Sequence, residues 1–159
     1  MTAAPSWRRL GQRPGFLIRR LHQIHVALFM AECAGFGVTP VQFSLLSVLA
    51  ARPGLDQAAL ALEVGVDRAT TANVIARLER RRLLRRRRSA GDRRVKLAEP
   101  TAAGLALLAR IDRAARAAHA RTLAPLDAAE RAVFVALLRR LVDAGNAHGR
   151  APLRLDPGD

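Results

Sequence analysis

The sequence predicts a mainly α-helical protein that carries one small β-hairpin. Residues 83–97 place two short apolar ends around a Ser-Ala-Gly-Asp turn, with cations crowding both arms, which is typical of a basic hairpin. Residues 56–81, directly before it, hold two short capped helical segments separated by Gly65, which is typical of a helix-turn-helix. Together the two segments predict a winged helix-turn-helix, in which the hairpin leans on a bundle of short helices.

The helices before the hairpin are predicted from apolar spacing and caps. Residues 14–34 carry apolar side chains at spacings of three and four, which predicts one long amphipathic helix. Thr39 and Gln42 can form a capping box around Pro40 for a helix that ends near residue 51. Asp56 is expected to cap a short helix to about residue 63, and Asp67 a third to about residue 81.

Two further helices are predicted after the hairpin. Pro100-Thr101 opens a long helix that ends near residue 123, and Gly104 is expected to weaken its first turn. Asp127 and Glu130 form a second capping box, which predicts a last helix rich in leucine and valine.

The charge balance favours an anionic partner. Lys and Arg number 27 against 13 acidic residues, which gives a net charge of +14 in a chain of 159 residues. Such a balance is typical of binding to nucleic acid or to an anionic membrane surface. No apolar run approaches the roughly 20 residues of a membrane span, and we find no targeting segment, so we expect a cytoplasmic protein.

The third short helix has the pattern of a DNA-reading helix. Thr71, Val74, Ile75 and Leu78 share one face and are expected to pack inward. The opposite face is polar and free of acid beyond the cap, so it fits a major groove, where Asn pairs with adenine and Arg with guanine or phosphate. The candidate contacts on this helix are Arg68, Ala69, Thr70, Asn73 and Arg77.

The hairpin supplies a second set of candidate DNA contacts. Because side chains alternate along a strand, roughly half of residues 84–88 face each side, and Arg86 and Arg88 are candidates for the DNA side. Arg93 and Arg94 follow the turn, where a wing tip can enter a narrow, electronegative minor groove. Asp92 is expected to pair with Arg94 and to hold the tip in shape.

These residues resemble the multiple-antibiotic-resistance regulator (MarR) family of winged-helix transcription factors, over residues 14–143 in element order. Asp92-Arg93-Arg94 is similar to the family's Asp-x-Arg wing motif, and residues 101–104 to the Thr-x-x-Gly that opens its fifth helix. Residues 67–71 and 78–81 resemble its recognition helix. Arg82 and Pro100 depart from the family's usual glycine and leucine, which leaves the geometry at the two ends of the hairpin open.

The resemblance implies an intertwined homodimer in which the first, fifth and sixth helices of the two chains interleave. The terminal helices are rich in Leu, Ala and Val, which independently favours packing against a partner. Two-fold symmetry then predicts a palindromic operator in double-stranded DNA. The resemblance further implies repression that a small molecule relieves. The expected parts are a flexible arm (1–13), dimerisation helices (14–38 and 101–145), a DNA-binding lobe (39–100) and a flexible tail (146–159).

The resemblance also implies a small aromatic carboxylate as effector, and no other cofactor. Residues 19–25 look like the corresponding run in repressors of nicotinate or aromatic-acid catabolism, so a hydroxylated nicotinate is one candidate. Arg or His can neutralise a carboxylate, a second His can bond a ring hydroxyl or nitrogen, and apolar side chains can form a wall. The candidate effector residues are Arg19, Arg20, His22, His25, Phe29, Met30 and Phe43.

Several alternatives stay open at this point. His22 and His25 can instead be dimer contacts or surface residues, and a metal site is not expected because no further ligands complete a shell. Cys33 is either a small core residue or the thiol of a redox-sensing regulator, although the tyrosines that usually hold such a thiolate are absent. A nonspecific DNA-packing protein would also explain the arginines. No catalytic motif favours an enzyme.

Overall fold

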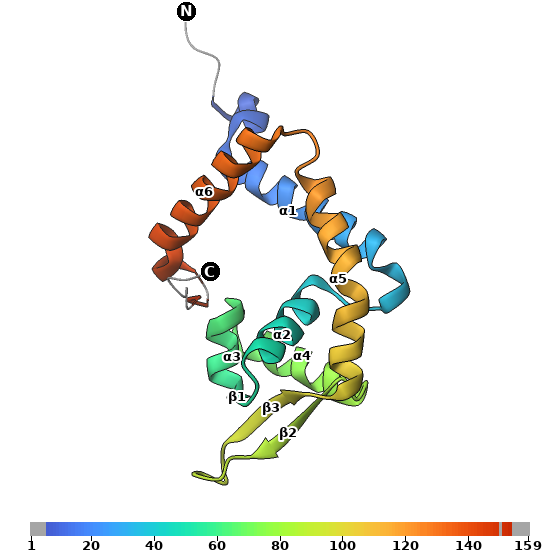
Figure 1. The fold of residues 1–159 in the computed structure, drawn as a ribbon. Coiled ribbons are helices and arrows are strands. Elements are labelled where there is room, and N and C mark those ends of the chain that lie inside the picture. The colour runs from blue at the N-terminus through green and yellow to red at the C-terminus, as the bar shows by residue number, and fades with distance from the viewer. Residues whose placement is uncertain (1–5, 150, 154–159) are drawn as a thin grey trace, which may run out of the picture.

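The computed structural model describes residues 6–149 and 151–153. Figure 1 shows a long helix, α5, running from the sheet at one end of the molecule to α1 at the other. The short helices α2, α3 and α4 gather beside the sheet. The elements are η1 (Ser6–Gln12), α1 (Pro14–Glu32), η2 (Ala34–Phe36), α2 (Pro40–Ala51), β1 (Leu55–Asp56), α3 (Gln57–Val64), α4 (Arg68–Arg80), β2 (Leu84–Arg88), β3 (Lys96–Pro100), α5 (Ala102–Thr122), α6 (Ala128–Gly145) and η3 (Asn146–His148).

Side-chain caps begin the helices where the sequence places them. Thr39 and Gln42 form the predicted capping box at α2, with the backbone N–H of Gln42 donating to Thr39 Oγ1 at 3.3 Å. Asp56 accepts from the backbone N–H of Ala59 at the start of α3. Asp127 and its box partner start α6 in the same way. Each cap satisfies backbone donors that a helix N-terminus leaves open.

The sheet has three strands rather than the two of the predicted hairpin. Its order is β1-β3-β2, with antiparallel pairing throughout. Leu55 pairs with Ala98, and Arg86 pairs with Ala98 from the other side. The hairpin therefore reaches Pro100, three residues past the predicted end at residue 97. The sequence does not signal β1, because a strand of two residues carries no periodicity and exists only through its pairing with β3.

Two apolar cores hold the two ends of the molecule. The first packs α2, α3 and α4 under the sheet, and it contains Val74, Ile75 and Leu78 of α4, while Thr71, the fourth predicted inward residue, is also buried. The second packs α1 against α5. The buried side chains of the first are Leu45, Leu46, Leu49, Leu60, Val74, Ile75, Leu78, Leu83, Leu84 and Ala98, and those of the second are Phe29, Cys33, Val38, Ile111, Ala115 and Ala118.

The junction between β2 and α5 gives Gly104 a role that the sequence analysis missed. A Cβ at Gly104 would lie 2.0 Å from the carbonyl oxygen of Leu83, so only glycine allows this approach. Thr101 caps α5 and ties it to the same segment, because its hydroxyl donates to the Arg82 carbonyl at 2.7 Å. Gly104 therefore admits α5 to the sheet instead of merely weakening a helical turn.

Short helices lie within both terminal segments of the described chain. Ser6–Gln12 forms η1, and Asn146–His148 forms η3. The Asn146 side chain exchanges two hydrogen bonds with the Leu153 backbone, at 2.6 and 2.7 Å, which fastens the segment after α6. Residues 1–5, 150 and 154–159 lie outside the described residues.

The helices at the α1–α6 end leave apolar side chains in solvent. Ile18 of α1 is 60% exposed, and Val133 and Leu141 of α6 are 58% and 63% exposed. Exposed apolar surface of this extent is typical of an interface. No helix in the described part of the chain is both long and apolar enough to cross a membrane.

Candidate DNA interface and effector cavity

Helix α4 presents the two faces that its sequence predicts. Thr71, Val74, Ile75 and Leu78 are buried, and the opposite side of the helix is in solvent. Asp67 caps the helix by accepting from both the backbone N–H and the hydroxyl of Thr70, at 2.9 and 2.7 Å. These hydrogen bonds lower the pKa of Asp67, so the cap stays ionised at neutral pH. The polar face of α4 is thus held outward by a packed core behind it.

Every candidate DNA contact lies at the surface, but the arginines differ in what they already bind. The guanidinium groups of Arg68, Arg77, Arg88 and Arg93 form no hydrogen bond or ion pair with other described residues, so they are available to a ligand. The exposed candidates are Arg68, Ala69, Thr70, Asn73, Arg77, Arg86, Arg88, Arg93 and Arg94.

Arg86 is paired within the protein, which strand alternation alone does not indicate. Its Nη2 and Nε donate to Glu79 Oε2 of α4 at 2.5 and 3.1 Å. Arg85 and Arg87 both reach Glu99 of β3, and the hydrogen bond from Arg87 is the main cause of the lowered pKa of Glu99. Arg86 therefore fastens the wing to α4, and this ion pair keeps the two predicted DNA-reading elements side by side.

The wing tip is braced in the manner that the sequence predicts. Asp92 accepts from the backbone N–H of Arg94 at 2.9 Å and from its guanidinium at 3.2 and 3.3 Å. The hydrogen bonds from Arg94 lower the pKa of Asp92. The Val95 amide closes the turn by donating to the Asp92 carbonyl at 3.0 Å. The tip is therefore ordered around one ion pair, and Arg94 remains largely exposed beside it.

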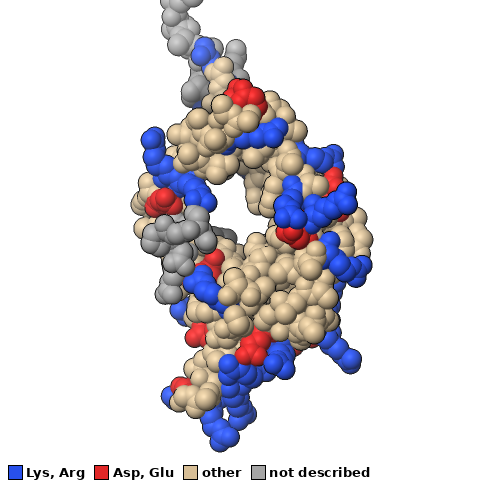
Figure 2. Space-filling model, in the orientation of Figure 1, with Lys and Arg blue, Asp and Glu red and all other residues tan. Residues whose placement is uncertain are grey.

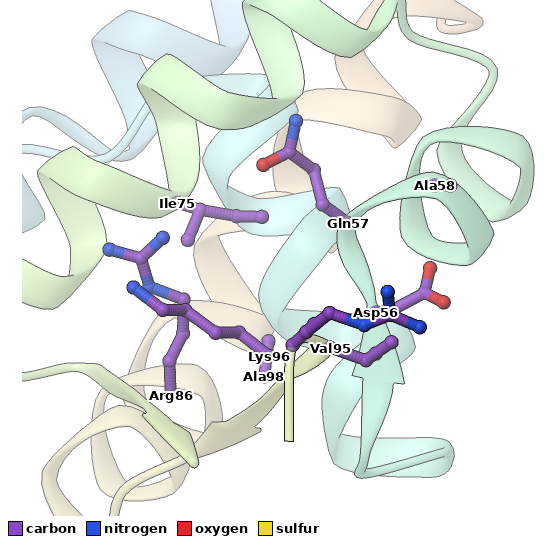
Figure 3. Close-up of a pocket in the computed structure, with 9 residues that line it drawn as sticks. Asp56, Gln57, Ala58, Ile75, Arg86, Val95, Lys96 and Ala98 are labelled. Atoms are coloured by element: carbon purple, nitrogen blue, oxygen red, sulfur yellow. The ribbon is translucent and has the colours of Figure 1, made fainter. Parts of the chain in front are cut away.

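A cationic cleft of about 290 Å³ opens between α3, α4 and the wing. Figure 3 shows side chains from all three elements around it. Its cations are Arg86, Arg94 and Lys96, and its acid is Asp56. In Figure 2, Lys and Arg gather at the wing end of the visible face. The lining residues are Asp56, Gln57, Ala58, Ile75, Arg86, Arg94, Val95, Lys96 and Ala98.

A second cavity, of about 400 Å³, lies among α1, α5 and α6 and is mostly apolar. Its polar atoms belong to imidazoles and one hydroxyl. The rings of His25 and His119 stack with their centroids 5.2 Å apart. The lining residues are Ile18, Leu21, His22, His25, His119, Thr122, Leu123, Phe134, Val135 and Leu138.

The hydrogen bonds around His25 fix its ring. The Thr122 hydroxyl donates its only hydrogen to the Ala118 carbonyl at 2.8 Å, so it accepts from His25 Nδ1 at 2.9 Å. Neutral His25 therefore carries its proton on Nδ1 and keeps Nε2 as an acceptor. Burial lowers the pKa of His25, and the charges of His119 and His22 lower it further, so the ring is neutral near pH 7.

The structure brings together only part of the predicted effector set. His22 and His25 line the cavity, whereas Arg19, Arg20 and Met30 are exposed outside its lining. The Arg19 guanidinium lies over the ring of Phe16, and Arg20 donates to Gln23 at 2.9 Å. Phe29 is buried in the second core, and Phe43 lines a separate cavity of about 590 Å³. The predicted apolar wall from Phe29, Met30 and Phe43 is therefore not the wall of this cavity.

The comparisons with known proteins agree on one family. A family model described as the MarR family matches residues 36–95, from the end of η2 to the wing tip. The transcriptional repressor NicR of Pseudomonas putida is 32% identical over 138 residues, which cover 87% of each chain.

The chain belongs to the MarR family.

Solved structures of related regulators share the fold of this MarR-family chain. BpsR of Bordetella bronchiseptica, whose DNA binding is regulated by 6-hydroxynicotinic acid, is 31% identical with a TM-score of 0.83 over 88% of this chain and 99% of that one. PcaV of Streptomyces coelicolor, solved with its natural ligand, is 38% identical with a TM-score of 0.78 over 91% and 99%. The chain is thus a MarR-type transcriptional repressor with a winged-helix DNA-binding fold, and not an enzyme.

The structure bears on two of the alternatives left open by the sequence, a redox role for Cys33 and a metal site. Cys33 is 1% exposed, and burial raises the pKa of its thiol, so it lacks the accessible thiolate that a redox sensor uses. Among the described residues, no group of three His, Cys, Asp or Glu is placed to hold a metal ion.

Sequence reasoning missed residues that pair with the wing arginines or position His25. Glu79 and Glu99 decide which wing arginines are paired, and nothing local marks them. Thr122 follows His119 by three residues, so helical spacing could have placed both on the same side of α5. The α6 part of the cavity wall could not be found, because the sequence does not say where α6 lies.

Proposed function

We propose that this chain binds a palindromic operator in double-stranded DNA as a homodimer, and that a small aromatic acid in the His25 cavity releases it. The observation that carries the DNA part is the joint presentation of α4 and the wing. The Glu79–Arg86 ion pair holds the two elements together, and on them lie Arg68, Arg77 and Arg93, whose guanidinium groups pair with no other side chain among the described residues. Such a surface suits a recognition helix in the major groove with a wing beside it.

Within this proposal the phosphate and base contacts come from different residues. Asn73 and Arg77 lie exposed in the middle of α4, where they suit adenine and guanine edges. Arg68 at the start of α4 and Arg88 in the wing suit phosphates, which position the protein without reading sequence. Arg93 and Arg94 at the tip suit the minor groove.

A homodimer accounts for the apolar surface of α1 and α6. In the described part of the chain α6 buries none of its own residues fully, although it is rich in leucine and valine. Figure 2 shows an opening through the molecule, which helices of a second copy can enter. A two-fold dimer carries two wings and so calls for two half-sites about one helical turn apart.

The DNA proposal is tested by binding at matched salt to a palindrome upstream of the protein's own gene and to random duplex. We expect the palindrome to bind at least about 10³-fold more tightly, as specific regulators do. Equal affinities would instead favour the nonspecific DNA-packing protein. Arg94→Ala should weaken operator binding without unfolding the dimer. Arg116→Ala, which removes an exposed cation that is likewise paired to an aspartate, Asp112 on α5, should leave operator binding unchanged. An unchanged dissociation constant for Arg94→Ala in a mobility-shift titration would exclude the wing contact.

The effector proposal rests on the chemistry of the His25 cavity. Its volume of about 400 Å³ lies in the range of small-molecule sites, and its apolar walls suit a planar ring. Nε2 of His25 can accept a hydrogen bond from a ring N–H or hydroxyl, and the imidazole N–H of His22 or His119 can donate a hydrogen bond to a carboxylate. The regulation of the similar BpsR by 6-hydroxynicotinic acid supports a hydroxylated nicotinate as the first compound to test.

A thermal-shift screen of aromatic carboxylates tests this part, because a specific ligand stabilises the native dimer by mass action. We expect a hydroxylated nicotinate or benzoate to raise the melting temperature and to weaken operator binding. His22→Ala and His25→Ala should blunt the release and leave DNA binding intact. A normal release curve in both variants would show that the effector binds elsewhere.

A further inference from the structure

Arg81 joins the end of helix α4 to the connector between α1 and α2. It is the C-cap residue of α4, and its guanidinium reaches across to η2. Nη1 donates to the Gly37 carbonyl at 2.5 Å, and Nη2 donates to the Phe36 carbonyl at 3.0 Å. A planar guanidinium offers two donors in a fixed fork, so the pair of bonds fixes both distance and direction between the two segments.

The connector that Arg81 holds is itself packed against α5. Phe36 packs on the second core, and the Arg110 guanidinium of α5 lies 5.6 Å from the centre of its ring. Val38, one residue past the hydrogen-bonded carbonyls, is 1% exposed. Gly37 adopts φ +60, which other residues adopt only with strain. The two carbonyls therefore move with the second core and cannot easily move alone.

The second core also borders the His25 cavity. The Phe29 ring lies 6.5 Å from the ring of His25 and belongs to the core against which Phe36 packs. A continuous set of packed groups thus runs from the cavity wall through Phe29 and Phe36 to Arg81 at the end of the recognition helix. Packed cores shift between discrete arrangements, so a change at one end can displace the other.

We propose that Arg81 couples the His25 cavity to the recognition helix, as a positioning residue that touches neither DNA base nor effector. This inference rests on the proposed release of DNA by an aromatic acid. When the acid fills the cavity, α1 and the second core shift, the Phe36 and Gly37 carbonyls follow, and the fork of Arg81 turns the end of α4. Without the two hydrogen bonds of the Arg81 guanidinium, the protein binds operator DNA and the aromatic acid, but binding of the acid no longer lowers the affinity for DNA.

The experiment measures the linkage directly. The dissociation constant of the operator is determined by fluorescence anisotropy with and without saturating 6-hydroxynicotinate, and binding of 6-hydroxynicotinate alone is determined by calorimetry. The wild-type dimer should lose about 5- to 150-fold in DNA affinity, the usual range of allosteric coupling. In Arg81→Ala this ratio should fall to within about twofold of one, while each ligand alone binds within about threefold of wild type.

Two further variants make the result specific. Arg113→Ala removes an exposed cation from α5 and should keep the wild-type ratio, which controls for charge. Arg81→Lys keeps the charge and the packed stem but loses the fork, so it too should lose most of the ratio, and it serves if the alanine variant folds poorly. A wild-type ratio in both Arg81 variants overturns this inference alone. A ratio of one in the wild-type protein overturns the proposed effector function, and this inference with it.

Discussion

Replacing Gly104 with alanine tests whether α5 lies as close to Leu83, the residue just before β2, as the structure indicates. In an ordinary helix this change stabilises by about 1 kcal/mol, because alanine loses less backbone entropy on folding. Here the new Cβ would meet the Leu83 carbonyl oxygen at 2.0 Å and its carbon at 3.0 Å. Both are backbone atoms, so no side chain can rotate away, and α5 must retreat by roughly 1 Å.

The cost follows from what that retreat disturbs. Overpacking of this kind costs about 1–3 kcal/mol. The retreat also stretches the hydrogen bond from the Thr101 amide to the Leu83 carbonyl, now 3.0 Å, which contributes about 0.5–1.5 kcal/mol. Set against the gain of about 1 kcal/mol from alanine in a helix, these costs predict that Gly104→Ala lowers the free energy of unfolding by about 2 kcal/mol. This corresponds to a fall in melting temperature of about 4–8 °C.

The assay is thermal unfolding followed by circular dichroism, at one fixed protein concentration because the stability of a dimer depends on it. Gly15→Ala is the matched control, since Gly15 lies in α1 with no heavy atom within 4 Å of the added Cβ. That variant should melt at or slightly above the wild-type temperature. If Gly104→Ala also melts at or above the wild-type temperature, the close approach of α5 to β2 is wrong.

Two further predictions follow from titratable groups. Burial, His119 and His22 lower the pKa of His25 below 6.5, so as the pH falls the unfolded chain takes up the proton first and stability is lost toward the folded pKa. The decrease in melting temperature when the pH is lowered from about 7.5 to 5 should therefore be smaller in His25→Gln than in wild type. Equal decreases in the two proteins would contradict a lowered pKa of His25. Because Cys33 is buried with a raised thiol pKa, a thiol-reactive dye should label it only as the protein unfolds, whereas rapid labelling of the native dimer would revive the redox alternative.

Local chemistry explains why the helices and the recognition face could be predicted from the sequence. The cap at Asp67 acts on an amide three residues away, and Thr71, Val74, Ile75 and Leu78 share a face at any place in a fold. The Asp92–Arg94 pair spans two residues at a tight turn, so it too is visible in the chain. Each of these features needs only neighbours in sequence.

The His25 cavity shows where such reasoning ends. The sequence indicates that His22 and His25 share a side of α1, but His119 and Thr122 come from α5, nearly a hundred residues later, and Phe134 comes from α6. The predicted partners Arg19 and Arg20 do not line the cavity, because Ile18 and Leu21 on either side of them do, and each step along a helix turns the side chain by about 100°. Helical periodicity gives the angles between the side chains of α1, but it does not say which side of α1 faces α5.

The amino-acid sequence by itself determined the α-helices and the hairpin, their order, the outward face of the recognition helix and the family, because caps, turns and helical spacing act over a few residues. The tertiary structure alone decided that β1 joins the sheet, that Gly104 admits α5 to β2, that Glu79 and Glu99 occupy three of the wing arginines, and that Arg81 holds the α1–α2 connector. These features depend on distances between atoms whose residues lie far apart in the chain, and those distances are fixed only when the two cores pack.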